Sequence, residues 1–130
     1  MGKDSPSRTI AIEGSSSLRV FAHIIIDSFD FDFDHAYGFY DNLKNWTRAK
    51  ECYEYFVDME DSFGAADNAQ SVINNTIKTA FASRDKMLFL FDYGDEWLFT
   101  VKLVKKTDPA KGMNYPAIIE SIGEAPPQYQ

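Results

Sequence analysis

The sequence predicts an α+β fold, in which a mostly antiparallel sheet of four to five strands carries two helices packed on one face. The clearest observation is a hairpin, because residues 86–93 and 96–106 are both strand-like and a Gly-Asp turn joins them. Two further stretches, 18–29 and 69–82, repeat apolar residues at helical spacing. Since strands and helices are interspersed and the best pairing is a hairpin, the pattern favours an antiparallel sheet.

A strand and a helix are expected near the N-terminus. Residues 8–13 alternate apolar and polar side chains, which is typical of a short strand. Gly14 and the serines after it interrupt this pattern, and Ser17 can cap the helix that follows. His23 lies one turn before Asp27 on a polar face, so the simplest interpretation places it at the surface. The apolar face of this helix contains Leu18, Phe21, Ala22, Ile25, Ile26 and Phe29.

The middle of the chain is harder to interpret. Residues 35–40 resemble a strand in which Gly38 permits a bulge or close packing. The stretch 44–63 fits a strand by its aromatic residues and a short helix by its acids, and both alternatives stay open. Asn68 can cap the helix expected over 69–82. The apolar stripe of that helix would consist of Val72, Ile73, Ile77, Ala80 and Phe81.

The C-terminal third continues the sheet. In the second strand of the hairpin, one face carries four apolar residues and the other is mixed, which indicates a sheet with one side on a core. Residues 116–121 form a further candidate strand before a proline-rich tail at 124–130. We expect a single domain over 1–130, with a flexible N-terminus at 1–7. The apolar face of the hairpin strand consists of Trp97, Phe99, Val101 and Leu103.

The charge distribution restricts the class of partner. Between Asp27 and Asp61 there are ten acidic and three basic residues, which account for the whole net charge of −7. An acidic domain repels nucleic acid phosphates unless its basic residues are segregated, so the charge distribution disfavours nucleic-acid binding. The best basic patch has the spacing of an ordinary solvated strand end and consists of Lys102, Lys105, Lys106 and Lys111.

The cysteine content and the N-terminus predict a cytoplasmic protein. Cys52 is the only cysteine, so no internal disulfide can form, and a reducing compartment is expected. A lone cysteine of this kind is usually a small buried apolar residue. Residues 1–9 lack the apolar run of a signal peptide, and no stretch approaches the length of a membrane span.

Three blocks of the sequence resemble the Ri-plasmid pRiA4b open-reading-frame-three-like family, whose members also occur as passenger proteins of insertion elements. The blocks are residues 17–41, the hairpin 87–103 with its aromatic-Asp-aromatic-Gly-Asp-x-Trp pattern, and residues 115–129. Together they extend over roughly residues 8–129. The resemblance implies a compact α+β domain and assigns no activity, because the biochemical role of the family is not established.

The chain departs from the family pattern at three places. Many relatives have a histidine where this sequence has Phe99, and many end in a cysteine-containing acidic motif where this one reads GEAPPQY. These two departures weaken any family-wide proposal of a metal or catalytic site. Relatives usually begin with a further strand before the segment that matches residues 8–13, which leads us to expect an exposed sheet edge that favours pairing with another chain.

The segment FDFDFDHAYGFYD, at 29–41, suggests a calcium loop at first sight. Asp30, Asp32 and Asp34 alternate with phenylalanines, and Asp41 stands at the twelfth position. Such a loop needs glycine at its sixth position, where this chain has His35, and it usually has glutamate at its twelfth. We therefore expect the phenylalanines to pack between helix and strand and the aspartates to face water.

The hairpin turn supplies the second candidate site. Gly94 is expected to provide a positive φ, and Asp95 to accept hydrogen bonds from the turn amides. The functional alternative adds His35 to Asp92 and Asp95, as ligands of a divalent metal or as a general base, with Trp97 in the same motif. This alternative requires residues that are far apart in sequence to converge.

The leading interpretation of the whole sequence is a non-catalytic domain that binds another protein or a second copy of itself. Exposed acids, abundant aromatic residues and the missing first strand motivate it. No residue is assigned a catalytic role, and no cofactor is expected. The alternative is the metal or hydrolytic site at His35, Asp92 and Asp95, and a weaker alternative is a nucleic-acid accessory protein.

Overall fold

The computed structural model describes residues 5–59 and 64–129, and these contain two β-sheets. The larger sheet has five strands in the order β4-β3-β2-β5-β6. Every pairing in it is antiparallel except that of β3 with β4. The α+β class and the mostly antiparallel sheet are therefore confirmed. The strands are β2 (Tyr37–Tyr40), β3 (Cys52–Glu54), β4 (Ala69–Gln70), β5 (Lys86–Phe91) and β6 (Trp97–Lys102).

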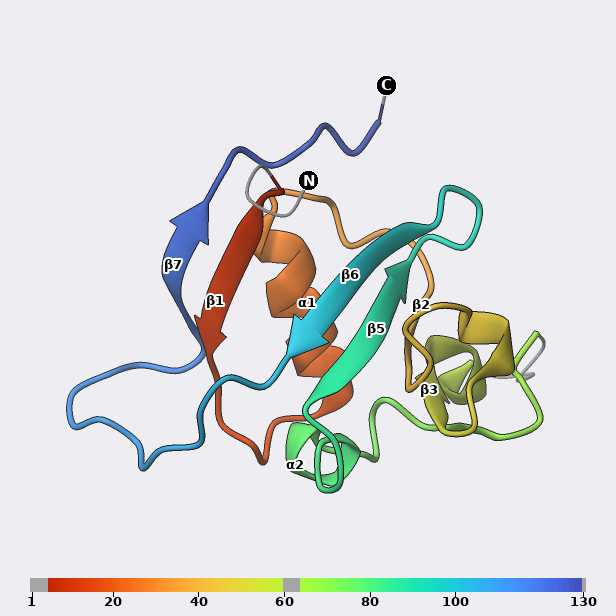
Figure 1. Cartoon of the computed structure of the whole chain (residues 1–130), viewed down its shortest axis with the longest axis horizontal. Helices are drawn as coiled ribbons and strands as arrows, with labels where there is room; N and C mark the ends of the chain where they lie inside the picture. Colours follow the sequence, from red (N-terminus) through yellow and green to blue (C-terminus); the bar gives the residue numbers. More distant parts are fainter. Residues whose placement is uncertain (1–4, 60–63, 130) are drawn as a thin grey trace.

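The smaller sheet pairs the two ends of the chain. β1 (Ser7–Ala11) runs antiparallel to β7 (Ala117–Ile122), with a register shift between Thr9 and Ile10. The strand expected over 116–121 is thus present, and its partner is the N-terminal strand. Figure 1 shows this pair to the left of β6.

Helix α1 (Leu18–Ser28) has a side-chain cap at its N-terminus and a left-handed residue just past its C-terminus. The Ser17 hydroxyl oxygen accepts a hydrogen bond from the amide of Val20 at 3.1 Å, which confirms the predicted cap. At the other end Asp30 adopts a left-handed φ of 60°, and the amide of Phe31 donates to the carbonyl of Ile26 at 3.1 Å. A left-handed residue just past the last turn is a common way to end a helix, and short polar aspartate tolerates it.

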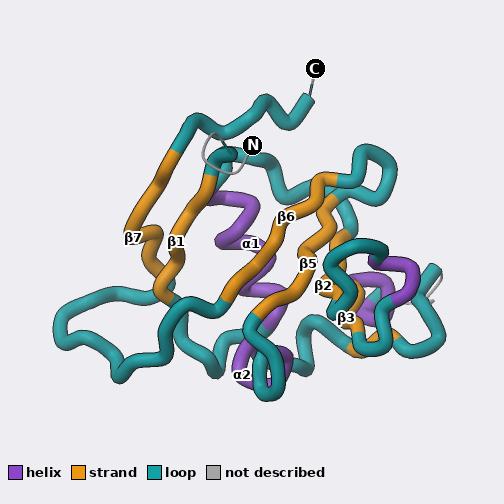
Figure 2. The backbone as a smooth tube through the Cα atoms, viewed as in Figure 1, coloured by secondary structure: helices purple, strands orange, loops and turns teal. Residues whose placement is uncertain are grey.

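The apolar face of α1 joins the helix to both sheets in one core. The rings of Phe21 and Phe39 are stacked with centroids 5.7 Å apart, and Phe29 lies 5.3 Å from Phe99. From β1, the guanidinium of Arg8 lies 4.5 Å from the Phe29 ring centroid, which is a cation–π contact. Figure 2 shows α1 drawn behind the strands. All six residues of the predicted apolar face are buried: Leu18, Phe21, Ala22, Ile25, Ile26 and Phe29.

The prediction of a helix over 69–82 is wrong in both the length of the helix and the residue that caps it. Helix α2 covers only Ile77–Ala80, and the side chain of Thr76 caps it. Residues 71–74 follow another path because side chains bind the amides that a longer helix would need. The Asp58 carboxylate accepts from the amide of Val72 at 2.9 Å, and the hydroxyl of Ser71 accepts from the next two amides.

The stretch 44–63 contains both of the structures that its composition allows. Strand β3 lies between two short 3-10 helices, η2 (Trp46–Arg48) and η3 (Tyr55–Asp58). Residues 60–63 lie outside the described part, as do residues 1–4 of the N-terminus that was expected to be flexible. In the described ranges, none of the helices has the length and apolar content that crossing a membrane requires.

Candidate functional site

The structure brings His35 and Asp92 together at one end of the larger sheet. His35 precedes β2 and Asp92 follows β5, and these strands pair antiparallel with Tyr37 opposite Phe91. The amide of Asp92 continues this ladder by donating to the carbonyl of Ala36 at 2.9 Å. As a result, Nε2 of His35 lies 3.5 Å from Oδ2 of Asp92. Asp92 is buried, whereas the imidazole lies at the surface.

The turn after β5 is organised by Asp92, so the roles predicted for Gly94 and Asp95 are wrong. The positive φ angles belong to Asp92, at 67°, and to Glu96, at 49°. The Oδ1 atom of Asp92 accepts hydrogen bonds from the amides of Gly94 at 3.1 Å and of Asp95 at 3.3 Å. Aspartate suits this position because it tolerates the left-handed region and its carboxylate can bind amides two and three residues ahead.

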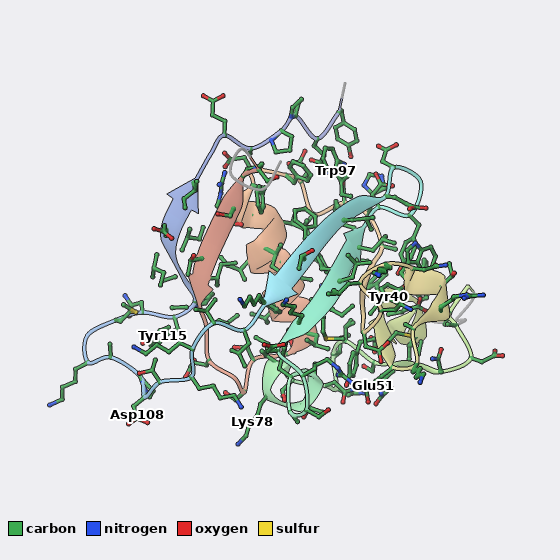
Figure 3. All side chains as sticks on the ribbon, viewed as in Figure 1. Tyr40, Glu51, Lys78, Trp97, Asp108 and Tyr115 are labelled. Atoms are coloured by element: carbon green, nitrogen blue, oxygen red, sulfur yellow. The ribbon has the colours of Figure 1, made fainter. Side chains whose placement is uncertain are left out.

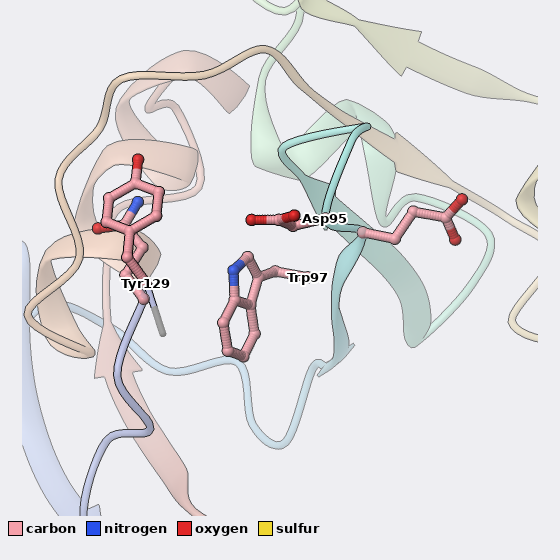
Figure 4. Close-up of a pocket in the computed structure, with 5 residues that line it drawn as sticks. Asp95, Trp97 and Tyr129 are labelled. Carbon is pink, nitrogen blue, oxygen red and sulfur yellow. The ribbon is translucent and has the colours of Figure 1, made fainter.

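A cavity of about 470 Å³ opens between this hairpin and the C-terminal tail, and its lining residues are Asp95, Glu96, Trp97, Gln128 and Tyr129. Figure 4 shows Tyr129 facing Asp95 and Trp97 across the opening. The indole Nε1 of Trp97 is buried and makes no hydrogen bond within the part of the chain that the structure describes. A buried donor without an acceptor costs free energy, so an acceptor group supplied by a ligand would be favourable here.

The tail of the chain lies against this site. The side-chain oxygen of Gln128 accepts from the Asp32 amide at 2.7 Å, and its Nε2 donates to the Asp32 carbonyl at 3.0 Å. The glutamine amide thus bonds to the backbone as the peptide group of a neighbouring strand would. The hydroxyl of Tyr129 donates to Oδ2 of Asp34 at 2.8 Å. The sequence predicted this segment only as a proline-rich tail, and its contacts are long-range.

Hydrogen bonding at Asp34 keeps the two partners of the tail contact in complementary protonation states. The bond from Tyr129 holds the pKa of Asp34 below its usual value of 3.8, and Nδ1 of His35, 2.7 Å from Oδ1, acts in the same direction. The same bond raises the pKa of Tyr129 to about 12. The carboxylate is therefore an acceptor and the phenol a donor over the whole range between these values.

Phenylalanines of segment 29–41 pack against aromatic residues of β5 and β6 beside the site, as the packing interpretation of this segment expects. Phe31 meets Trp97 edge to face at 4.8 Å, and Phe33 stacks on Phe91 at 6.0 Å. Asp30, Asp32 and Asp34 are exposed. The packing interpretation of FDFDFD is confirmed, and Asp41, which stands at the twelfth position of the calcium-loop pattern rejected from the sequence, binds the amides of residues 50 and 51.

The four predicted site residues fall into two adjoining groups. His35 and Asp92 are in contact, while Asp95 and Trp97 line the cavity next to them. Within residues 5–59 and 64–129, no three or more His, Cys, Asp and Glu side chains are grouped so that they could hold a metal ion. The prediction missed Asp34, Gln128 and Tyr129, which make the polar contacts of the site.

Comparison with known proteins identifies the kind of domain. The family described as plasmid pRiA4b ORF-3-like protein matches residues 2–129. Among solved structures, a protein of unknown function from Methanosarcina mazei Go1 has a similar fold, with a TM-score of 0.74 and 18% sequence identity. The match covers 94% of this chain and 64% of that one, and at this identity the likeness concerns the fold alone. No curated protein matches the chain.

Proposed function

The chain belongs to the family of plasmid pRiA4b ORF-3-like proteins, and we propose that this member is a non-catalytic protein-binding module. Its site takes an extended, proline-rich segment that contains Pro-Pro-Gln-Tyr, supplied by another protein or by a second copy of the chain. Family membership leaves the activity open, so the proposal depends on the site.

The observation that carries the proposal is that the chain's own tail is hydrogen-bonded to this site. Gln128 bonds to both backbone groups of Asp32, and Tyr129 bonds to the carboxylate of Asp34. Bonds made by the backbone of a bound segment favour any extended chain, whereas bonds made by its side chains select its sequence. The side-chain amide of Gln128 and the hydroxyl of Tyr129 are therefore both selective contacts. The two prolines before Gln128 reduce the conformational entropy that an extended segment loses on binding.

A tail that occupies the site within one chain can be replaced by the same segment from another. The tethered tail has an effective concentration of about millimolar, so a free segment must compete with it. The same contacts made between two chains would link them as a dimer, in the manner of a domain swap. Binding of a separate segment and exchange of tails between two copies would use the same contacts.

The experiment measures binding of a fluorescein-labelled peptide of residues 123–130 by fluorescence anisotropy. The full-length Gln128→Ala/Tyr129→Ala variant should bind the peptide more tightly than the wild-type chain does, because its own tail no longer competes. A peptide with phenylalanine in place of the tyrosine should bind more weakly, and so should the original peptide to a variant that also carries Asp34→Asn. Light scattering after size exclusion measures the oligomeric state in parallel.

Two results would overturn the proposal. One is an absence of peptide binding by the vacated variant together with a strictly monomeric wild-type chain. The other is equal binding of the tyrosine and phenylalanine peptides, which would remove Asp34 from recognition. The double variant should keep its unfolding midpoint close to that of the wild type, because Tyr129 is 51% exposed.

The contact of His35 with Asp92 favours a second candidate function, a divalent-metal or hydrolytic site that Asp95 would join only after a rearrangement, because the described side chains do not already form a group of three ligands. Nε2 of His35, which faces Asp92 at 3.5 Å, would be the metal ligand or the base, and Asp34, whose Oδ1 lies 2.7 Å from Nδ1, would orient the ring. Thermal unfolding with Zn²⁺, Mn²⁺ and Mg²⁺ tests this, with His35→Ala against the matched control His23→Ala, which changes the exposed histidine on α1. A stabilising shift in the wild type and in His23→Ala, lost in His35→Ala, would support it, and no shift in any chain would end it.

A further inference from the structure

A second polar cluster lies on the face of the larger sheet opposite to the one that packs on α1, around the carboxylate of Glu54. Glu54 ends β3 and is 2% exposed. The hydroxyl of Tyr40 donates to its Oε2, and the amide of Ala66 donates to its Oε1 at 2.8 Å. The hydroxyl of Tyr93 lies 2.6 Å from that of Tyr40. Figure 3 shows Tyr40 well apart from Trp97, so this cluster is separate from the tail site.

The backbone of β2 makes room for this arrangement. A Cβ atom on Gly38 would lie 2.7 Å from the hydroxyl oxygen of Tyr93 and 2.8 Å from that of Tyr40. No side chain other than hydrogen fits there without moving the two phenols. The close packing predicted for Gly38 is thus present, and it holds both hydroxyls beside the buried carboxylate.

The carboxylate of Glu54 forms no ion pair with a protein cation among the residues that the structure describes. Both of its contacts are donors, as an ionised carboxylate requires, and burial raises the pKa of Tyr40 and of Tyr93, so both phenols keep their protons. A buried carboxylate held only by neutral donors is stabilised further by any cation that reaches it.

A cavity of about 230 Å³ leads to this carboxylate. Its walls include the ring of Tyr40 and the half-buried indole of Trp46, whose centroids are 5.2 Å apart with planes inclined at 54°. Asn68 also lines the cavity; its Nδ2 donates to the carbonyls of Ala49 and Lys50, and its Oδ1 accepts from the Cys52 thiol at 3.6 Å and has a second lone pair for a further donor. The cavity therefore combines aromatic faces, an amide oxygen and a carboxylate.

We propose that this cavity binds a small organic cation, the protonated or methylated head of an alkylamine. The carboxylate of Glu54 would neutralise its charge, and the faces of Trp46 and Tyr40 would contact its methyl or methylene groups. Tryptophan is the best aromatic partner for such cations, and methylammonium groups are bound in this way elsewhere in proteins. The acidic stretch between Asp27 and Asp61, which includes Glu54, raises the local concentration of cations.

A divalent metal ion fits the cavity less well than an organic cation. Such ions require several oxygen, nitrogen or sulfur ligands at short range. The part of the chain that the structure describes offers no group of three or more His, Cys, Asp and Glu side chains around a common point. Apolar and aromatic walls instead suit a cation that carries its own methyl groups. The proposal uses residues that the tail site does not use and stands independently of it.

The experiment compares choline with 3,3-dimethylbutan-1-ol, which has the same shape without the charge. Both are titrated into the ¹⁵N-labelled full-length chain, and the indole resonances of Trp46 and Trp97 are followed by NMR. Choline should shift the Trp46 resonance and leave that of Trp97 in place. The alcohol should bind more weakly by about tenfold or more, because a desolvated cation–π contact and the carboxylate both require charge.

Variants then assign the contacts. Trp46→Leu and Glu54→Gln should each weaken choline binding by about tenfold, whereas the control Asp67→Asn, which removes an exposed charge next to Asn68, should change it by less than about twofold. Trp46→Leu and the comparison of the two probes decide the question if Glu54→Gln does not fold. Equal binding of choline and the alcohol would overturn the proposal, as would a shift of Trp97 in place of Trp46, or no saturable shift at all.

Discussion

The Nε2 atom of His35 lies 3.5 Å from Oδ2 of Asp92, and the sheet register is the cause. Tyr37 on β2 is opposite Phe91 on β5, so the residues just outside the two strands are also neighbours. In an antiparallel pair the start of one strand lies beside the end of the other. One turn residue therefore serves two purposes, since Asp92 closes the hairpin with Oδ1 and faces the imidazole with Oδ2.

This double use predicts different results for two substitutions of Asp92. Asp92→Asn keeps an acceptor for the turn amides and tolerates a φ of 67°, so it should reduce the free energy of unfolding by less than about 1 kcal/mol. Asp92→Ala leaves two amides without their acceptor and places alanine in the left-handed region, which should cost about 2–3 kcal/mol. Urea unfolding measures both. Equal losses would show that the charge opposite His35, and not the turn, determines stability.

The hydroxyl pair of Tyr40 and Tyr93 predicts the effect of filling Gly38. Gly38→Ala should destabilise the chain by about 1–3 kcal/mol, because a methyl group would lie within 3 Å of both oxygens. Gly14→Ala is the matched control, since its Cβ would meet only Lys78 at 3.5 Å and its φ is not left-handed. Thermal and urea unfolding of the two variants provide the comparison. A Gly38→Ala chain as stable as the Gly14→Ala chain would contradict the packing of this cluster.

Sequence patterns predicted the elements whose signals are local. The Ser17 cap, the apolar face of α1 and the alternation along β6 each depend on residues within a few positions of one another. The helix over 69–82 failed because Asp58, which lies outside it, binds the amide of Val72. No periodicity within the segment contains that contact, and tertiary interactions override spacing of this kind.

The candidate site was predicted only in part, because some of its residues are contiguous in the sequence and others are not. Its hairpin motif is contiguous, so Asp92 and Trp97 could be selected from the sequence. Gln128 and Tyr129 could not, because their partners Asp32 and Asp34 lie 96 and 95 positions earlier in the sequence and only the fold brings them together. Glu54 could not be selected from the sequence either, because it lies in a stretch that fits both strand and helix. Its burial depends on the pairing of β3 with β2.

The bond between Tyr129 and Asp34 predicts a pH range for docking of the tail. The pKa of Asp34 is lower in the folded chain than its usual 3.8, so the bond contributes stability above that value and is lost as the pH falls through the folded pKa. At the alkaline end, the pKa of Tyr129 is raised from 10.0 to about 12, so the contribution is present below pH 10 and is lost as the pH rises through about 12. Tyr129→Phe should move the Asp34 pKa toward 3.8. NMR titration of the Asp34 carboxyl carbon tests this, and an unchanged pKa would show that Tyr129 does not bind there.

Cys52 supplies a probe of the sheet face that carries Glu54. It is 1% exposed, and burial, with Glu54 as the next cause, raises its thiol pKa from 9.0 to about 12. The folded chain favours the neutral thiol, so this contribution to stability is complete below pH 9 and is lost as the pH rises through about 12. A thiol that is both buried and protonated should react with Ellman's reagent at pH 8 only when the chain opens, and Gly38→Ala should speed the reaction in proportion to the stability that it removes. Stopped-flow absorbance measures the rates, with Gly14→Ala as the control. Fast labelling of the native wild-type chain would show that the thiol is accessible and would contradict the packing of Cys52.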